Sequence, residues 1–442
     1  MNDLAGRRRL PAVAGLMAFA LLLSACAQLL PGSAEDRQIV VLWHTFTGSE
    51  AHAIEALTDR FNAENPWQML LITEYQEHLV GKLSEAPDGW PDLVTVWPED
   101  MQTYVALDMV GASPEASPDL RPAWGDILPM ARSLYAMEGE VQALPLGLAT
   151  YLAYYNMEWL GDLGYDASVA GWEDFRRTAC GATDPLRGRI GVGVPARASV
   201  LLAFLAASGS EVLGEDGYYQ FSDEAGRGAA AQLQSMMAGE CGMVYQDWGW
   251  GPGQLGRSSM AVIVESSKRL AEVEQAVLEG RNFPLGIGAL PGHTGPGNTL
   301  WYGPGLMVSA PEGVRQDNAL RVLSWFFSTE AQATWGAMTD LLPVRLSVLE
   351  AALAESEQTM GTSLETDLLR LALATAGSES WVAWPPATDR MTCRASLLRA
   401  LLAFQSEEAD TDAYIDTAVT ACNTGVGFRL QPPPVPTEEE GQ

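Results

Sequence analysis

Ile39-Val40-Val41-Leu42-Trp43 is a continuous apolar run with the length of one buried β-strand. The segment that follows carries apolar residues on one helical face, with a candidate N-cap at Ser49 and a stop signal at Asn65-Pro66. Residues 69–73 are a second apolar strand. A strand, a helix and a strand in this order predict a βαβ unit with a parallel crossover, and therefore an α/β fold.

The same alternation of strands and helices continues along the chain. Further strands are predicted at 93–97, 152–155, 260–264, 283–287 and 306–309. The later part is mostly helical, with helices predicted at 317–327, 329–338, 347–357, 362–375, 394–405 and 410–422. Thr329 and Gln332 have the spacing of a capping box. The tail over 426–442, rich in Pro and Glu, is predicted to be disordered.

The composition excludes some classes of partner. Lys and Arg total 26 and Asp and Glu total 56, so the 442-residue chain has a formal charge of −30. Binding to nucleic acid, or to anionic lipid through basic residues, requires a positive surface, and we expect neither. An apolar fraction of 47% is typical of a globular protein.

The N-terminus predicts export. Three arginines at 7–9 precede an apolar stretch over 10–23, which is shorter than the roughly 20 residues of a membrane-spanning helix. Leu23-Ser24-Ala25-Cys26 resembles the lipobox of bacterial lipoproteins. It implies a signal peptide over 1–25 and a lipidated Cys26 with a tether over 26–36, on the outer face of the cytoplasmic membrane or in the periplasm. An ordinary signal peptide or an uncleaved anchor is the alternative.

Four cysteines remain once Cys26 is assigned to the lipid. An even number in an exported chain predicts disulfides. Three pairings are possible, and we favour Cys180–Cys241 with Cys393–Cys422 because each joins neighbours along the chain. A zinc site is the alternative, but no clustered Cys and His spacing supports it. We therefore expect no bound metal.

The first strand, continued through His44-Thr45-Phe46-Thr47-Gly48-Ser49-Glu50, resembles the start of a bacterial extracellular solute-binding protein. The similarity is to the carbohydrate-type family that serves ABC importers, and it extends over residues 38–425. Five more motifs follow in the order and spacing of that family: Pro91-Asp92-Leu93-Val94, Leu144-Pro145 with Tyr154-Tyr155-Asn156, Trp172-Glu173-Asp174-Phe175, Phe327-Ser328-Thr329-Glu330-Ala331-Gln332 and Leu342-Pro343-Val344-Arg345.

This resemblance implies a two-lobed periplasmic-binding-protein fold of type II, with discontinuous lobes joined by a hinge. The first lobe is expected over 37–147 plus 303–345, and the second over 148–302 plus 346–425. A solute that contacts both lobes stabilises the closed state and so shifts the population toward it.

A sugar site needs flat aromatic rings for the CH faces of the sugar and a few hydrogen-bonding groups for its hydroxyls. Open α/β sheets bind ligands where their strands end. The segments that leave the predicted strands, or cross between the lobes, therefore supply candidates, for which packing in the core is the alternative: His44, Phe46, Thr47, Trp97 and Tyr151.

Further candidates come from loops and from the resemblance. Loops that combine Trp with Gly or Pro supply Trp248, Trp250, Trp381 and Trp384. The family resemblance implies ligand contacts at a strand end and in a glycine-rich crossing, from Ser266, Ser267, Trp301, Tyr302 and the backbone amide of Gly303.

The expected solute is an uncharged sugar or oligosaccharide. Relatives that bind glycerol phosphates carry, as the family implies, a Tyr before the Leu-Pro turn and a Ser in the first crossing, where this chain has Asp340-Leu341 and Leu148-Ala149. The negative charge of the chain also disfavours an anion. A receptor for another small polar solute, either of the glycerol-phosphate type or an amine, stays the alternative. The amine is included because Trp-rich sites bind quaternary ammonium groups.

A secreted hydrolase is the rival class. The chain has no Gly-x-Ser-x-Gly or His-Glu-x-x-His motif, and pairs such as Glu99-Asp100 arise by chance among 56 acidic residues. We predict a monomeric binding protein without enzymatic activity or cofactor. Its partners are a small solute and the transmembrane subunits of an ABC permease.

Overall fold

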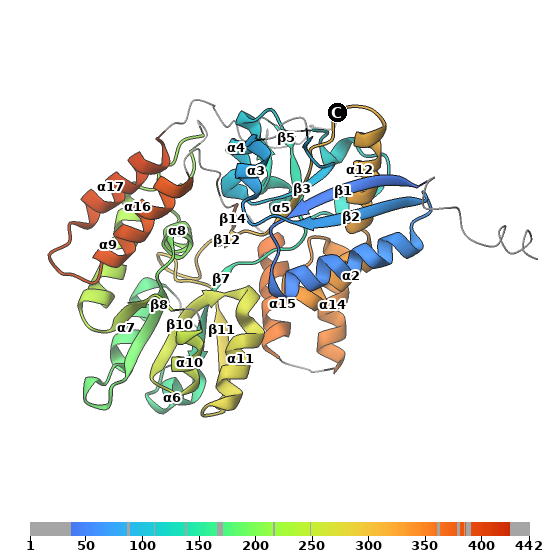
Figure 1. Cartoon of the computed structure of the whole chain (residues 1–442). Coiled ribbons are helices and arrows are strands. Elements are labelled where there is room, and N and C mark those ends of the chain that lie inside the picture. The colour runs from blue at the N-terminus through green and yellow to red at the C-terminus, as the bar shows by residue number, and fades with distance from the viewer. Residues whose placement is uncertain are drawn as a thin grey trace, which may run out of the picture.

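Two five-stranded mixed sheets define two lobes (Figure 1). The computed structural model describes residues 37–85, 89–109, 111–137, 139–165, 171–214, 217–247, 249–359, 363–377, 381–383, 385 and 390–424. The α/β class and the two lobes confirm the predicted architecture. The predicted signal peptide, Cys26, the tether up to residue 36 and the tail over 426–442 lie outside the described residues. No helix within the described ranges is long and apolar enough to cross a bilayer.

The first sheet has the strand order β2-β1-β3-β13-β6. Strand β1 (Gln38–His44) pairs in parallel with β2 (Met69–Tyr75) and with β3 (Leu93–Val96). Strand β13 (Gly305–Val308) is antiparallel to both β3 and β6 (Ala143–Pro145). The parallel crossover predicted from the opening stretch is confirmed, since α2 (Gly48–Glu64) connects β1 to β2.

The second sheet has the order β11-β7-β10-β8-β9. Its strands are β7 (Tyr151–Asn156), β8 (Ile190–Pro195), β9 (Gly242–Tyr245), β10 (Met260–Ser266) and β11 (Leu285–Gly288). The sequence did not predict β8 or β9, because glycines lower the strand propensity of both. The glycines of β8 are required by packing: a Cβ at Gly191 would lie 1.7 Å from the carbonyl oxygen of Ala179.

Helices cover the sheets of both lobes (Figure 1). Around the first sheet lie α2, α3 (Leu79–Glu85), α4 (Met101–Ala106), α5 (Pro129–Ser133), α12 (Val314–Phe326) and α13 (Thr329–Thr339). Around the second lie α6 (Met157–Asp162), α7 (Trp172–Ala182), α8 (Ala198–Ala207), α9 (Glu224–Ala238), α10 (Trp250–Gly256), α11 (Leu270–Glu279), α16 (Arg390–Ala403) and α17 (Thr411–Cys422). The pair α14 (Leu346–Thr359) and α15 (Leu364–Ala376) contacts α13 on one side and β11 on the other.

Short elements complete the described chain. Two small sheets pair β12 (Thr299–Trp301) with β14 (Trp381–Ala383), and β4 (Ala136–Met137) with β5 (Glu140–Val141). The 3-10 helices are η3 (Pro98–Asp100), η4 (Pro114–Ala116), η5 (Arg121–Asp126), η6 (Pro185–Arg187) and η7 (Ser267–Arg269).

Two predicted helix caps are wrong. Helix α2 is preceded by Thr47 rather than Ser49, and no side chain caps it. Helix α13 is capped by the hydroxyl of Ser328, so the predicted capping box at Thr329 does not form. Gln332 is instead fully buried, and its amide donates to the carbonyl oxygen of Leu146 at 3.2 Å. Its role is therefore to support the segment that crosses between the lobes.

The chain crosses between the sheets along three adjacent segments. The first crossing, after β6, is hydrogen-bonded on both sides: Ala149 N donates to Tyr302 O at 2.7 Å, and Leu148 N donates to Leu342 O at 2.8 Å. Gly303 allows this close approach, because a Cβ there would lie 1.9 Å from the carbonyl oxygen of Gly147. These three segments are joined by hydrogen bonds where the chain passes between the two sheets, and we call them the hinge.

Both favoured disulfides are present. Cys180–Cys241 joins the end of α7 to the segment before β9, and Cys393–Cys422 joins α16 to the end of α17. Both bridges lie among the elements around the second sheet. The pairing of neighbours along the chain is confirmed.

Candidate ligand-binding site

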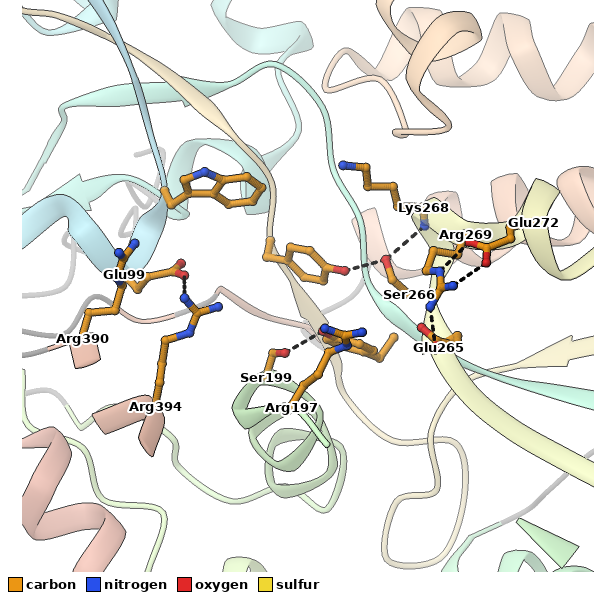
Figure 2. A pocket seen from close by; sticks show the side chains of 13 residues that line it. Glu99, Arg197, Ser199, Glu265, Ser266, Lys268, Arg269, Glu272, Arg390 and Arg394 are labelled. Atoms are coloured by element: carbon orange, nitrogen blue, oxygen red, sulfur yellow. Dashed lines mark hydrogen bonds and ion pairs between the residues drawn. The ribbon is translucent and has the colours of Figure 1, made fainter. Parts of the chain in front are cut away.

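A cavity of about 500 Å³ lies between the two lobes above the hinge. Its walls come from the end of β3, from the hinge, from the end of β10 and from the helices α8 and α16 (Figure 2). The volume is within the range of clefts that enclose small solutes. The site therefore lies where strands of both sheets end.

Three aromatic side chains form one part of the lining. Trp97 directly follows β3, and the rings of Tyr151 and Tyr302 stack with centroids 5.5 Å apart. The hydroxyl of Tyr151 is 2.6 Å from that of Ser199, and Tyr302 donates to the hydroxyl of Ser266 at 2.5 Å. These bonds hold both rings in place, and we call the three aromatic residues the aromatic wall.

A buried ion-pair network forms the wall next to β10. Arg269 donates to Glu265 at 2.8 Å and to both carboxylate oxygens of Glu272, at 2.5 and 2.8 Å. Tyr245 also donates to Glu265 at 2.9 Å. Glu265 is almost completely buried, and these donors replace the water that its carboxylate loses.

Ion pairs between η3 and α16 form the opposite wall. Arg390 Nη1 lies 2.7 Å from Asp100 Oδ2, and Arg394 Nη1 lies 3.7 Å from Glu99 Oε1. Burial raises the pKa of Asp100 to about 6, although Arg390 lowers it. Because η3 follows β3 and α16 packs on α8, these pairs connect the two lobes.

A further ion pair connects the lobes near the wall that lies next to β10. Lys268 in η7 lies 2.6 Å from Glu50 in the first turn of α2. Glu50 is buried and Lys268 is partly exposed. The ends of β10 and β1 are thus linked through the elements that directly follow them.

The local charge of the cavity differs from that of the chain. Three carboxylates line it, from Glu99, Glu265 and Glu272, and five cations line it, from Arg197, Lys268, Arg269, Arg390 and Arg394. A cavity responds to its nearest charges more than to distant, screened ones. Asp100 and Glu50 do not line the cavity but pair with Arg390 and Lys268, so five carboxylates balance the five cations there. The net charge of −30 therefore does not by itself exclude an anionic solute from this cavity.

Four of the predicted ligand-binding residues line the cavity: Trp97, Tyr151, Ser266 and Tyr302. They come from β3, β7, β10 and the return crossing, so segments far apart in the sequence converge here. Whether they contact solute stays a prediction.

The three candidates after β1 lie elsewhere. Phe46 is buried against Trp335, with ring centroids 5.3 Å apart. His44 is also buried, and its Nδ1 accepts a hydrogen bond from the amide of Phe46 at 3.2 Å. Burial lowers the pKa of His44, which favours the neutral ring that can accept this bond. Thr47 is exposed at the start of α2. None of the three lines the described cavity.

Three candidates near the hinge have structural roles. Ser267 is buried and accepts from the amide of Thr150 at 3.1 Å. Trp301 is completely buried in β12. The carbonyl oxygen of Gly303 accepts from the hydroxyl of Tyr135 at 2.7 Å, and this glycine packs against the first crossing. They support the hinge and do not line the cavity.

The Trp-rich loops are partly described. Trp250 begins α10 and packs on Tyr245, with ring centroids 5.4 Å apart, so the prediction of a loop is wrong at this residue. Trp381 lies in β14 rather than in a loop, where it pairs with Thr299. Neither lines the cavity. Trp248 and Trp384 lie outside the described residues.

None of the charged residues that line the cavity was among the residues predicted from the sequence. Arg390 and Arg394 are one helical turn apart, which was a usable signal for a shared face. Lys268 and Arg269 directly follow the predicted pair Ser266 and Ser267. Arg197 was not a candidate because it follows β8, a strand that the sequence did not predict. Among the described residues no His, Cys, Asp and Glu cluster is arranged to hold a metal ion.

The fold and the cavity together define a class of protein, a two-lobed binding protein with its ligand site between hinged lobes. Over residues 56–362 the chain matches the family described as bacterial extracellular solute-binding protein, and it belongs to that family. This membership confirms the predicted class of receptor rather than enzyme. No curated protein sequence matches the chain.

Solved structures share the fold. The cyclic α-maltosyl-1,6-maltose binding protein of Arthrobacter globiformis has a TM-score of 0.70 and 18% identity, over 88% of this chain and 98% of that one. The sugar-binding protein MalE of Xanthomonas citri has a TM-score of 0.71 and 17% identity, over 87% and 96%. The maltotriose binding protein of Thermus thermophilus has a TM-score of 0.65 and 15% identity, over 88% and 100%. This likeness confirms the predicted periplasmic-binding-protein fold.

Proposed function

We propose that the protein is the receptor of an ABC importer for a sugar or oligosaccharide, which binds in the cavity between the lobes. The observation that carries this proposal is the aromatic wall beside rows of polar and charged groups, directly above the hinge. Aromatic rings take the CH faces of a sugar, and the polar groups take its hydroxyls. A solute held by both lobes stabilises the closed form that the permease receives.

Two proteins with this fold are named for the saccharides that they bind, which supports a saccharide as the solute. They bind cyclic α-maltosyl-1,6-maltose in one case and maltotriose in another. We propose that the protein is anchored outside the cytoplasmic membrane through a lipid on Cys26, and acts there as a monomer. The lobe bounds expected above, 37–147 plus 303–345 and 148–302 plus 346–425, belong to the same proposal.

A thermal-shift panel tests the receptor function. Sugars, oligosaccharides, polyols, glycerophosphodiesters and amines are each added to the purified protein. A solute present at 100 times its Kd stabilises the folded state by about 2.7 kcal/mol. At least one saccharide is expected to raise the melting temperature. Stabilisation by amines alone would point to the amine alternative, and hydrolysis of a glycan without any shift would contradict a receptor.

For the lipid anchor, intact mass of membrane-extracted protein is the measurement. The expected mass is that of residues 26–442 plus a lipid group. After proteolysis, the peptide that contains Cys26 is expected to carry the added mass of the lipid. A Cys26→Ala variant is expected to leave the membrane fraction. Recovery of that variant with the membrane at the wild-type level would contradict the anchor.

A further inference from the structure

Arg197, Arg390 and Arg394 line one side of the cavity, and we call them the cationic corner. Arg197 lies between β8 and α8, while Arg390 and Arg394 lie one turn apart on α16, which packs against α8. A small side pocket is lined by Arg390, Arg394 and Ala198, the first residue of α8, so the two helices meet here. Figure 2 shows Arg197 and Arg394 extending into the same space.

The start of α8 adds to the positive potential of this corner. The helix has ten residues and no side-chain cap at its N-terminus. The first amides of a helix have no partner within the helix, and they are the positive end of its dipole. Ser199 in this first turn lines the cavity. An oxyanion placed here meets the guanidinium groups and the helix dipole together.

The carboxylates that pair with Arg390 and Arg394 do not occupy all the N–H donors of these two arginines. Arg394 lies 3.7 Å from Glu99, which is longer than a charge-assisted hydrogen bond. Arg390 contacts Asp100 through a single nitrogen of a group that carries five N–H donors. Both arginines are about one third to one half exposed, so a solute in the cavity can reach them.

Arg269 is more tightly engaged than Arg390 or Arg394. Arg269 is held by Glu272 through two hydrogen bonds and by the buried Glu265 through a third. Lys268 lies 2.6 Å from the buried Glu50. This pair is about as close as that of Arg390 with Asp100. Arg394 has the longest ion pair of these four cations, so its guanidinium group is the one most available to a solute.

From this arrangement we infer that the cavity selects a sugar that carries an oxyanion, which binds at the cationic corner while the sugar ring packs on the aromatic wall. The inference rests on the proposed sugar-receptor function and names its substrate class. A guanidinium group binds a carboxylate or a phosphate through two parallel hydrogen bonds. A uronic acid and a sugar phosphate share this chemistry.

Calorimetric titration of the purified protein, with its disulfides intact, tests the inference. The probes are di- and trigalacturonate with their methyl esters, and glucose and maltose phosphates with the parent sugars. At least one anionic probe is expected to bind 10-fold or more tightly than its uncharged counterpart. The difference is expected to shrink as salt is added. Preference within the uronides or within the phosphates identifies the oxyanion.

Variants locate the effect at the corner. Arg394→Gln is expected to remove most of the 10-fold preference, because it weakens binding of the anionic probe more than binding of the uncharged counterpart. Arg394→Lys keeps the charge without the two parallel donors and should be intermediate. Arg370→Gln is the matched control, because Arg370 is an exposed residue of α15 paired with Glu357 and Asp367. Thermal melts of each variant establish that it is folded, and Arg197→Gln replaces Arg394→Gln if the latter is not.

The outcomes separate this inference from the receptor function. If uncharged saccharides bind as tightly as the anionic ones or more tightly, the inference is wrong and the sugar receptor stands. If no saccharide of either kind binds, both fail. An equal loss of preference in Arg370→Gln and Arg394→Gln would show a general charge effect and would also overturn the inference.

Discussion

At the scale of single residues, neighbours in the sequence have opposite roles in this site. Ser266 and Tyr302 line the cavity, while Ser267 and Trp301 are buried in support of the hinge. Side chains alternate between the two faces of an extended chain, so each pair divides in this way. The sequence located both pairs through their strand-end and crossing motifs. It did not determine which member faces the cavity, because that depends on the register of each strand against its neighbours.

Trp97 is the best residue of the aromatic wall to substitute, because it follows β3 and lies outside the hydrogen-bonded hinge. Trp97→Ala is expected to weaken solute binding about 10- to 100-fold, since the sugar loses a flat apolar partner. Calorimetry measures the change. Trp67→Ala is the control, because Trp67 packs on Phe61 in the first lobe outside the cavity. Equal losses in both variants would contradict a role of Trp97 in binding.

Asp100 gives a prediction for pH. Its pKa is raised from 3.8 to about 6 by burial, so the folded state holds this proton more strongly than the unfolded state. The contribution of this group to stability therefore rises as pH falls from about 6 to about 4, and is least favourable above 6. Asp100→Asn should stabilise the protein above pH 6, by up to ~3 kcal/mol, and the gain should vanish near pH 4.

Urea unfolding of both proteins between pH 4 and pH 8 measures this difference. Asp126→Asn is an opposite control, because hydrogen bonds from Ser347 and Arg345 lower the pKa of that carboxyl. That variant should be destabilised at neutral pH. A loss of stability in Asp100→Asn at pH 8 would show that the ion pair with Arg390 outweighs the cost of burial.

At the scale of elements, long apolar runs were predictable and glycine-rich strands were not. The apolar run in β1 favours a strand because it is shorter than a typical helix and rich in β-branched residues. Strand β8, Ile-Gly-Val-Gly-Val-Pro, contains residues that disfavour strands locally. Its identity depends on β10, which pairs with it from far away in the sequence, and on α7, whose Ala179 leaves no space for a side chain at Gly191.

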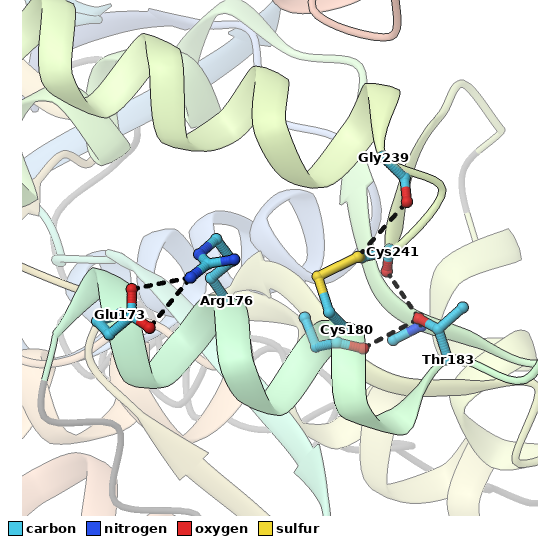
Figure 3. The surroundings of a disulfide bond; sticks show 8 residues. Glu173, Arg176, Cys180, Thr183, Gly239 and Cys241 are labelled. Carbon is cyan, nitrogen blue, oxygen red and sulfur yellow. Dashed lines mark hydrogen bonds and ion pairs between the residues drawn. A yellow bond between two sulfur atoms is a disulfide. The ribbon is translucent and has the colours of Figure 1, made fainter.

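The disulfides make a paired prediction. Figure 3 shows Cys180–Cys241 beside Thr183, whose hydroxyl donates to the carbonyl oxygen of Cys241 at 3.3 Å. In the chain-entropy model, bridges over 61 and 29 residues stabilise by about 4 and about 3.5 kcal/mol. Replacement of either pair by Ser should lower the stability by similar amounts. Only the Cys393/Cys422 variant should also weaken binding of the solute, because Arg390 and Arg394 lie on either side of Cys393.

Intact mass, thermal melts and calorimetry check this pair of variants. Reduction of the unfolded wild-type protein should add four hydrogens if both bridges have formed. Weaker binding in the Cys180/Cys241 variant, at a temperature where it is folded, would contradict the separate roles of the two bridges.

The hinge makes a steric prediction. A Cβ at Gly303 would lie 1.9 Å from a carbonyl oxygen of the neighbouring crossing, and backbone cannot move aside as a flexible side chain can. Gly303→Ala should therefore destabilise the protein by about 1–3 kcal/mol or more. Gly81→Ala is the control, because the Cβ added there has no neighbour within 4 Å and Ala is favoured over Gly in a helix. Chemical denaturation measures both, and a neutral Gly303→Ala would contradict the tight packing of the hinge.

At the scale of the whole molecule, the two-lobed fold was predictable and the charge of its cavity was not. Motif order along the chain implied the lobes and the hinge. The five cations of the cavity come from the segments 197, 268–269 and 390–394, which only the folded chain brings together. Global composition reports the average charge, and a cavity is lined by too few residues to follow that average.

We predict that the two lobes close when the solute binds. Solution scattering of the protein is expected to give a smaller radius of gyration when a stabilising solute saturates it, because the solute contacts both lobes. Lys268→Met removes an ion pair between the lobes and should shift the solute-free protein toward larger values. An unchanged radius of gyration with bound solute would mean that binding occurs without closure.

The position of β13 in the first sheet has a consequence for how the molecule forms. This strand covers one edge of β3, yet residues 305–308 leave the ribosome or an export channel long after residues 93–96. Until then the unpaired edge of β3 is open to other chains. The first lobe therefore completes only after most of the second has emerged, and the nascent protein needs protection from aggregation throughout that interval.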